Sequence, residues 1–313
     1  MIHGYRVGVL AIIITAVLWG TTGTAATFAP EAGPLAIGAA ALGLGGLAQA
    51  VIAVPALRAA RTGLRAHARL VAVGAGAVGV YPLAFYSSMH LAGVAIGSVV
   101  SLASAPLASG LLQHFVQRRP LGRPWALAAA LGIAGSTVLC LAAASAPVAS
   151  GRTAPAVVAG VLLGLVAGST YATYSWAVGQ LIGAGVSRAA AMGAVFGAGG
   201  ALLVPVLLLT GAPLLANGQA TLVAGYMAVV PMFAGYLLFG FGLARVPAAT
   251  ATTITLAEPA VATVLAVLVV GERLPWLGWA GMVLVAAALV LLAVHRPRRS
   301  PRGQPALQDA GQA

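Results

Sequence analysis

The chain has 313 residues, of which 61% are hydrophobic and only 6% are charged, and its mean hydropathy is +1.02. Soluble domains carry about 25% charged residues, so this composition excludes a soluble globular protein. Ten membrane-spanning helices of about 20 residues would use roughly 200 residues, which leaves no room for a large aqueous domain. The single cysteine, Cys140, excludes an intrachain disulfide and a cysteine-based metal site.

Apolar runs, broken at arginines, Pro/Gly turns and polar loops, predict ten membrane-spanning helices. Their predicted ranges are 7–28, 34–57, 70–91, 94–116, 125–145, 156–179, 189–210, 220–243, 248–270 and 276–294. Lipid offers no hydrogen-bond partner to an open backbone, and a barrel would show short alternating segments, so helices are expected. The predicted fold class is therefore all-α integral membrane, with ten transmembrane helices.

The net charge of +12 comes from sixteen arginines and four acids. We read this charge as membrane topology, so the expected partner is a lipid bilayer and no nucleic acid is expected. If the N-terminus is cytoplasmic, fourteen arginines fall on the cytoplasmic side and only Arg152 and Arg273 on the other. The positive-inside rule thus predicts cytoplasmic termini. The use of arginine without lysine suggests a GC-rich, bacterial gene. A cleaved signal peptide is the alternative reading of the first span, whose apolar run of about 20 residues exceeds the usual 7 to 15.

The two halves of the chain match each other at a shift of about 153 residues. Matching landmarks are Trp19-Gly20 with Tyr171-Ala172, the glycines of 43–46 with those of 197–200, and Tyr86 and Pro106 with Phe239 and Pro259. We therefore predict five-helix repeats at 1–145 and 156–294, followed by a disordered cytoplasmic tail at 295–313. Because five is odd, the second repeat must enter the membrane from the opposite side. Such inverted repeats can open a central site to either side in turn, which favours transport.

Three segments carry a family resemblance: Trp19-Gly20, the run Gly164–Val178, and Thr253–Leu274, which contains Glu-Pro and ends in Gly-Glu-Arg-Leu. With these residues the chain resembles ten-helix members of the drug/metabolite transporter superfamily, of the EamA-domain type. The first repeat departs from the pattern, since Arg118-Arg119 stands where the second has Gly271-Glu272-Arg273. The resemblance implies an inner-membrane exporter of amino acids or other small metabolites, with its cavity between the repeats.

Glu258 is the sharpest candidate for a functional residue, because it is the only acid near the middle of a predicted span. A charge at that depth costs about 2.5 to 3.5 kcal/mol on insertion scales. Thr255 and Thr252 lie three and six residues earlier, on adjoining parts of the same helix face. Glu258 is either a proton carrier or counter-ion for a substrate ammonium, or a structural acid bonded to neighbouring helices. No second acid accompanies it in the spans, so coupling to protons is expected over coupling to sodium.

Aromatic side chains well inside the spans predict a pocket with aromatic walls for an amphipathic substrate, with core packing as the alternative. The candidates are Trp19, Tyr81, Tyr86, Tyr171, Tyr174 and Tyr236. His90, four residues after Tyr86, is a further candidate because histidine changes charge near neutral pH, although a solvated helix-end histidine is the alternative.

Ser98, Ser101 and Ser104 form a polar stripe on the fourth predicted helix. Ser101 and Ser104 are candidates for lining the cavity, with close helix packing as the alternative. Pro106 and Pro259 occupy matched positions of the two repeats, where each can remove a backbone hydrogen bond. We predict that these two prolines act as hinges beside the substrate site.

The sequence also bears on three other classes of membrane protein: enzymes, channels and flippases. An intramembrane enzyme would need a nucleophile elbow, a His-Glu-x-x-His motif or paired acids, which the sequence lacks, so catalysis is not expected. A channel would need charge rings or a carbonyl filter. A flippase for lipid-like molecules stays open as the alternative, as does passive facilitation in place of proton coupling. No metal or cofactor is expected, and the sequence is compatible with a monomer or a dimer.

Overall fold

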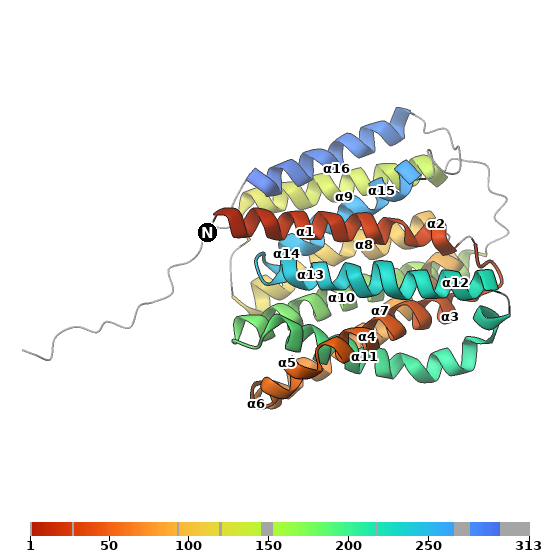
Figure 1. The fold of residues 1–313 in the computed structure, drawn as a ribbon. Coiled ribbons are helices and arrows are strands. Elements are labelled where there is room, and N and C mark those ends of the chain that lie inside the picture. The colour runs from red at the N-terminus through yellow and green to blue at the C-terminus, as the bar shows by residue number, and fades with distance from the viewer. Residues whose placement is uncertain are drawn as a thin grey trace, which may run out of the picture.

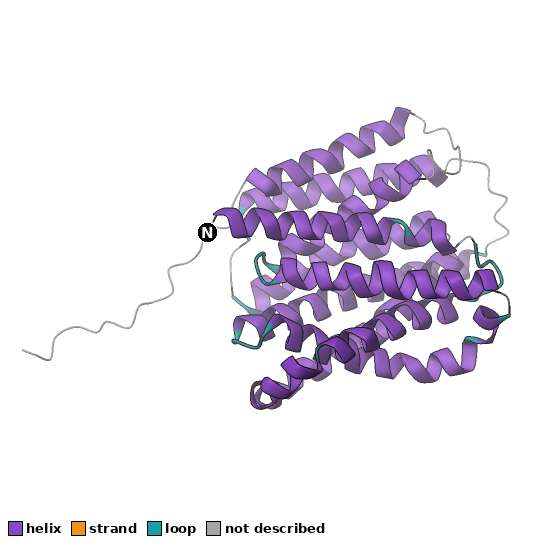
Figure 2. Ribbon diagram, viewed as in Figure 1, coloured by secondary structure: helices purple, strands orange, loops and turns teal. Residues whose placement is uncertain are grey.

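The structure is a computed structural model that describes residues 2–26, 28–92, 94–118, 121–144, 153–216, 218–265 and 276–294. Within these ranges the chain is helical apart from short connections, and no strand occurs among them (Figure 2). The predicted all-α fold is confirmed. The predicted tail at 295–313 and the Gly271-Glu272-Arg273 motif lie outside the described residues.

The first half forms five helical spans, several of them in more than one segment. These are α1 (Ile2–Gly20) with α2 (Thr22–Ala26); α3 (Pro34–Gly38), the π-helical η1 (Ala39–Leu44) and α4 (Gly45–Ile52); α7 (Ala68–Ala92); α8 (Val94–Leu111) with the π-helical η2 (Leu112–Val116); and α9 (Arg123–Ala144).

The second half also forms five helical spans, interrupted at other places. Its spans are α10 (Ala154–Gly183); α11 (Arg188–Thr210), followed by the short η3 (Ala212–Leu215); α12 (Gly218–Met227), the π-helical η4 (Ala228–Ala234) and α13 (Gly235–Leu243); α14 (Ala248–Ile254), the 3-10 segment η5 (Thr255–Ala257) and α15 (Glu258–Leu265); and α16 (Trp276–Val294).

Six helical stretches of the described chain are long and apolar enough to cross a membrane. They are Gly4–Ala26, Pro34–Ile52, Ala68–Ala92, Pro155–Gly183, Arg188–Thr210 and Gly218–Leu243. Shorter apolar helices occur at Val100–Val116 and Trp276–Ala288. Apart from turns at Thr21, Phe28 and Ala53, each of the ten predicted spans thus coincides with helix wherever the structure describes it. The reason is that an uninterrupted apolar run can satisfy its backbone in lipid only by helical hydrogen bonds.

The second span differs in detail from its prediction at 34–57. It breaks at Ala53, and the arginine-bearing connection that follows folds into two short helices, α5 (Val54–Ala59) and α6 (Arg61–Ala66). Pro55 explains the break, because it has no N–H to bond the carbonyl of Val51. At the start of a helix a proline costs no hydrogen bond, so the chain begins a new helix there.

The main helix pairs join the two halves of the chain: α7 with α10, α9 with α16, α4 with α11, and α1 with α13 (Figure 1). Glycines permit the closest of these approaches. A Cβ on Gly200 of α11 would lie 2.7 Å from the carbonyl oxygen of Gly43, and one on Gly164 of α10 would lie 3.0 Å from Ser88 Oγ on α7. These small residues let backbones meet where side chains would hold them apart.

Charge divides the two ends of the molecule. The arginines of the described chain lie at the end where α1 begins and where α5 and α6 lie, on the left of Figure 1. They are Arg6, Arg58, Arg61, Arg65, Arg69, Arg118, Arg123, Arg188 and Arg245. Glu31 lies in the connection between α2 and α3, at the other end. We call the first end the arginine-rich end.

Candidate functional site

Aromatic rings from both halves of the chain meet in the centre of the molecule. Trp19 of α1 packs against Tyr171 of α10 and Tyr236 of α13, with ring centroids 5.9 Å and 4.7 Å apart. Tyr81 of α7 lies 5.7 Å from Tyr171 and 5.6 Å from Tyr174. All five side chains are buried. These residues, predicted separately from the sequence, therefore form one cluster, which we call the aromatic centre.

Hydrogen bonds between helices fix the polar atoms of the aromatic centre. The hydroxyl groups of Tyr174 and Tyr236 are 2.7 Å apart. The Tyr171 hydroxyl lies 2.8 Å from Thr255 Oγ1, which itself donates to the carbonyl of Thr252 at 3.0 Å. Since the one hydroxyl hydrogen of Thr255 is used in that bond, Tyr171 is the donor to Thr255. The buried hydroxyls of Tyr171, Tyr174 and Tyr236 thus have protein partners, as their position requires.

Trp19 is held in place by the π-helical segment η4. Its indole N–H donates to the carbonyl of Pro231 at 3.0 Å, and one turn earlier Thr15 Oγ1 donates to the carbonyl of Gly235 at 3.1 Å. Both bonds join α1 to the span that contains η4 and α13. The carbonyls of Pro231 in η4 and of Gly235 at the start of α13 thus face α1, and the first of them orients Trp19.

Glu258 lies beside the aromatic centre as the first residue of α15, directly after the tight η5 segment. It is partly buried, and no hydrogen bond or ion pair to its carboxylate is found within the described parts of the chain. The helix α1 comes very close here, since a Cβ on Gly20 would lie 3.0 Å from the carbonyl oxygen of Glu258 and 2.8 Å from Val261.

A small closed space of about 10 Å³ separates Glu258 from the aromatic rings. Its walls come from both halves of the chain and are formed by Trp19, Thr22, Ala41, Leu42, Tyr81, Pro82, Phe85, Tyr86, Met232, Tyr236 and Glu258. A water molecule needs about 10 to 15 Å³ of such space, so this space holds at most about one water and is closed to a substrate in this conformation.

Several predicted site residues lie away from this centre. His90 is exposed at the end of α7. Ser101 and Ser104 of α8 donate to the carbonyls of Gly97 and Ser101, at 2.7 and 3.2 Å, within their own helix. A Cβ on Gly168 of α10 would collide with Ser104 Oγ, so this stripe faces a helix packed tightly against it. Thr252 bonds Ser109 at 3.1 Å and the preceding turn of its own helix.

The two prolines proposed as hinges have different surroundings. Helix α8 continues as an α-helix across Pro106 and becomes a π-helix only at Leu112. Pro259, in contrast, is the second residue of α15, the helix that directly follows η5. The hinge role of this pair stays a prediction.

The site residues predicted from the sequence did not include Phe196, whose ring centroid lies 4.4 Å from that of Tyr236, or Thr22 and Met232, which line the closed space. Phe239, 5.9 Å from Tyr236, was named as a landmark of the repeat. The sequence held a signal for Phe239 as a site residue, because Phe239 occupies the position that matches Tyr86 of the first repeat. Met232 is an ordinary apolar residue in an apolar run, and nothing in its sequence context distinguishes it.

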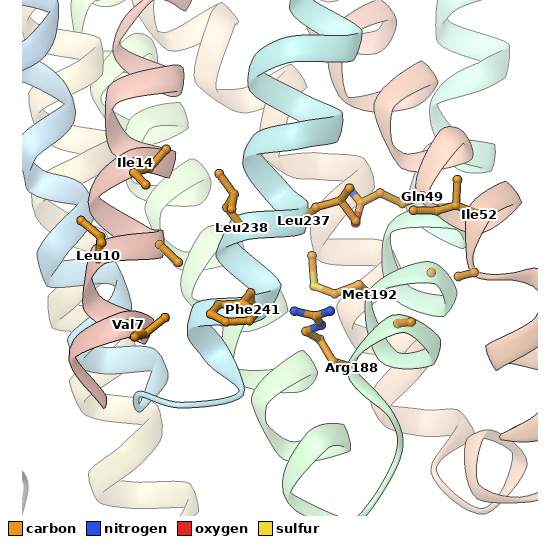
Figure 3. A pocket seen from close by; sticks show the side chains of 14 residues that line it. Val7, Leu10, Ile14, Gln49, Ile52, Arg188, Met192, Leu237, Leu238 and Phe241 are labelled. Atoms are coloured by element: carbon orange, nitrogen blue, oxygen red, sulfur yellow. The ribbon is translucent and has the colours of Figure 1, made fainter. Parts of the chain in front are cut away.

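A second and much larger cavity, of about 540 Å³, lies nearer the arginine-rich end, between α1, α4, α11 and α13 (Figure 3). Its walls are formed by Val7, Leu10, Ala11, Ile14, Gln49, Ile52, Ala53, Arg188, Ala189, Met192, Gly193, Leu237, Leu238 and Phe241. We call it the outer cavity. It too is built from both halves of the chain, but none of the predicted site residues lines it.

The fold and these sites define a multi-pass membrane protein with a polar and aromatic centre between its two halves, which is the architecture of secondary transporters. The profile of the EamA-like transporter family matches the chain twice, at residues 6–141 and 158–294. The chain belongs to this family and is a membrane transporter.

Individual relatives agree with this assignment. The protein named "Uncharacterized transporter YwfM", from Bacillus subtilis (strain 168), is 32% identical over 303 residues, covering 95% of this chain and 97% of its own length. A solved crystal structure matches with a TM-score of 0.71 at 21% identity, over 90% of this chain and 94% of that one. At that identity the second likeness concerns the fold alone.

Proposed function

We propose that this transporter exports amino acids or other small amphipathic metabolites across a bacterial cytoplasmic membrane by alternating access between its two repeats. The observation that carries the proposal is the aromatic centre. Trp19 and Tyr81 of the first half and Tyr171 and Tyr236 of the second meet there, next to the acid Glu258. A site shared by two halves changes its exposure when one half moves against the other.

The positions of the two cavities support a proposal about which side of the membrane the protein opens to in this conformation. The aromatic centre is closed, while the outer cavity lies toward the arginine-rich end. The positive-inside rule assigns an arginine-rich end to the cytoplasm. We therefore propose that this conformation receives substrate from the cytoplasm and that the centre opens when the helices around Trp19 and Glu258 separate.

We further propose that Glu258 takes up and releases protons during the cycle. Among the described residues none bonds the Glu258 carboxylate, and a carboxylate in such a partly buried position is expensive when ionised, which favours binding of a proton or of a substrate ammonium group. The aromatic rings around it would hold the apolar part of the substrate, and an ammonium group would be attracted to their faces.

The test is efflux from proteoliposomes that are preloaded with single radiolabelled amino acids or aromatic amines, with and without an imposed pH gradient. We expect at least one compound to leave faster than from protein-free vesicles, and the pH gradient to change its rate. Glu258→Gln removes the titrating group and should abolish the response to the gradient. Glu31→Gln, the same substitution in an exposed connection, is the matched control and should behave as the wild type.

Each part of the proposal has its own contrary result. If no compound of the panel leaves faster than from protein-free vesicles, the substrate class is wrong. If a compound is transported and Glu258→Gln keeps both the rate and the pH dependence of the wild type, Glu258 has no part in coupling.

A further inference from the structure

The outer cavity contains two polar groups in otherwise apolar walls. Gln49 of α4 is only 1% exposed, yet neither its amide nitrogen nor its amide oxygen has a hydrogen-bond partner among the described residues. Figure 3 shows its side chain reaching from α4 toward Leu237 of α13. A buried amide without a partner costs free energy, so natural proteins rarely keep one unless something else bonds it.

Arg188 is the second polar group. It is the first residue of α11, and its guanidinium lies 5.1 Å from the ring centre of Phe241 on the opposite wall (Figure 3). No acid lies among the residues that line the outer cavity. Of the acids in the described chain, Glu31 is at the far end of the molecule and Glu258 belongs to the aromatic centre. Arg188 therefore brings to this cavity a positive charge that no acid of the described chain neutralises.

A second arginine adds to the positive charge at this place. Arg245 has its guanidinium 3.4 Å from the centre of the same Phe241 ring and donates to the Phe241 carbonyl at 2.9 Å. The partial positive charge at the N-terminus of α11 acts in the same sense. Two guanidinium groups around one ring repel each other, and an anion between or beside them would reduce that repulsion.

The remaining walls are apolar and reach the outer surface of the helix bundle. Leu10 and Ile14 of α1 are 55% and 41% exposed, and Ile52 of α4 is 55% exposed. The volume of about 540 Å³ falls in the range of sites for small organic molecules, roughly 300 to 1,000 Å³. A ligand that fits this cavity therefore has an anionic head and an apolar body.

We propose that the outer cavity binds an amphipathic anion, whose carboxylate or phosphate pairs with Arg188 and accepts a hydrogen bond from the Gln49 amide. Its apolar body lies against Leu10, Ile14 and Leu237. The inference rests on the proposed function in one respect: such a ligand is the transported substrate, bound at a first site on the cytoplasmic side. The head group can belong to a free metabolite or to an anionic membrane lipid, and the experiment separates these sources.

The experiment is a calorimetric titration of the full chain in phosphatidylcholine nanodiscs. The probes are 4-phenylbutyrate, 4-phenylbutanol and 4-phenylbutylamine, which share the apolar body and differ in charge. We expect the carboxylate to bind at least about tenfold more tightly than the alcohol or the amine, because charge-assisted hydrogen bonds are about twice as strong as neutral ones. Equal affinity for all three probes would overturn the proposal.

Three variants assign the binding to this cavity. Arg188→Gln should weaken binding of the carboxylate about tenfold, whereas Arg61→Gln, an exposed arginine of α6 at the same end, loses the same charge and should leave binding unchanged. Gln49→Met should weaken binding while raising resistance to unfolding, because it removes an unpaired buried amide. If Arg188→Gln binds like Arg61→Gln, or if Gln49→Met leaves affinity unchanged, the assignment is wrong.

Two further arms separate the outcomes. In the first arm, phosphatidylglycerol replaces phosphatidylcholine in the nanodiscs. If an anionic lipid competes for Arg188, this change weakens 4-phenylbutyrate binding to the wild type but leaves binding to Arg188→Gln unaffected. Unchanged binding identifies a site for free metabolites. Glu258→Gln should bind the probe as the wild type does. If it does so and its efflux also keeps the rate and pH dependence of the wild type, the proposed proton role is refuted while the anion site stands.

Discussion

The paired hydroxyls of Tyr174 and Tyr236 give the sharpest test of the packed aromatic centre. Both side chains are buried, at 0% and 1% exposure, and their oxygens are 2.7 Å apart. Replacing one tyrosine with phenylalanine keeps the ring and leaves the other hydroxyl buried without its partner, which costs about 1 to 3 kcal/mol. Replacing both leaves no unpaired hydroxyl, so Tyr174→Phe/Tyr236→Phe should lie within about 1 kcal/mol of the wild type.

The free energy of unfolding of the wild type, both single variants and the double variant forms a double-mutant cycle. It can be measured by denaturation with sodium dodecyl sulfate in mixed micelles, followed by circular dichroism. Interhelical hydrogen bonds in membrane proteins give coupling energies of about 0.6 kcal/mol on average and about 1.7 kcal/mol at most, so we expect a coupling near the upper end. Tyr226→Phe removes a hydroxyl that is also paired, with Thr21 Oγ1 at 2.7 Å, but in an exposed position where water can replace the partner, so it should cost less than about 0.5 kcal/mol. Strict additivity of the two single changes would refute the pairing and the closed centre built on it.

Two further changes test the contacts between helices by the same unfolding assay. Gly46→Ala should destabilise the protein by about 1 to 3 kcal/mol, because the added methyl group collides with the backbone carbonyl of Phe196 on α11. The methyl group added by Gly23→Ala has no atom within 4 Å, so this control should change stability by less than about 0.5 kcal/mol. If the two substitutions destabilise the protein equally, the close crossing of α4 and α11 is contradicted. Trp19→Phe keeps an aromatic ring but loses the bond to the Pro231 carbonyl, so we expect a loss of about 0.5 to 1.5 kcal/mol, and an unchanged stability would mean that η4 does not hold α1.

Helix positions could be read from the sequence because they depend on local properties. Each uninterrupted apolar run must satisfy its own backbone within lipid, so its length and ends define a span without reference to any other part of the chain. Even where prediction and structure differ, the reason is local. Pro55 alone explains why the second span ends at Ala53 and why α5 begins there.

The composition of the aromatic centre was only partly predictable. Trp19, Tyr171 and Tyr236 were expected near one another because each lies deep in a span, and the structure brings them together. His90 satisfied the same helical spacing relative to Tyr86, yet it is exposed at the end of α7. Depth along a helix follows from residue number, but whether a side chain faces the centre depends on how that helix is rotated against its neighbours.

The outer cavity was decided by tertiary structure alone. Gln49 and Arg188 are 139 positions apart in the printed sequence, and neither was distinguished by a motif. They line one cavity because the small residues of α4 and α11 let these two helices cross closely, while α1 and α13 stand far enough away to leave a space. Sequence determined which segments cross the membrane and the class of transporter. Contact between distant helix faces, which no single segment encodes, determined where this transporter is closed and where it is open.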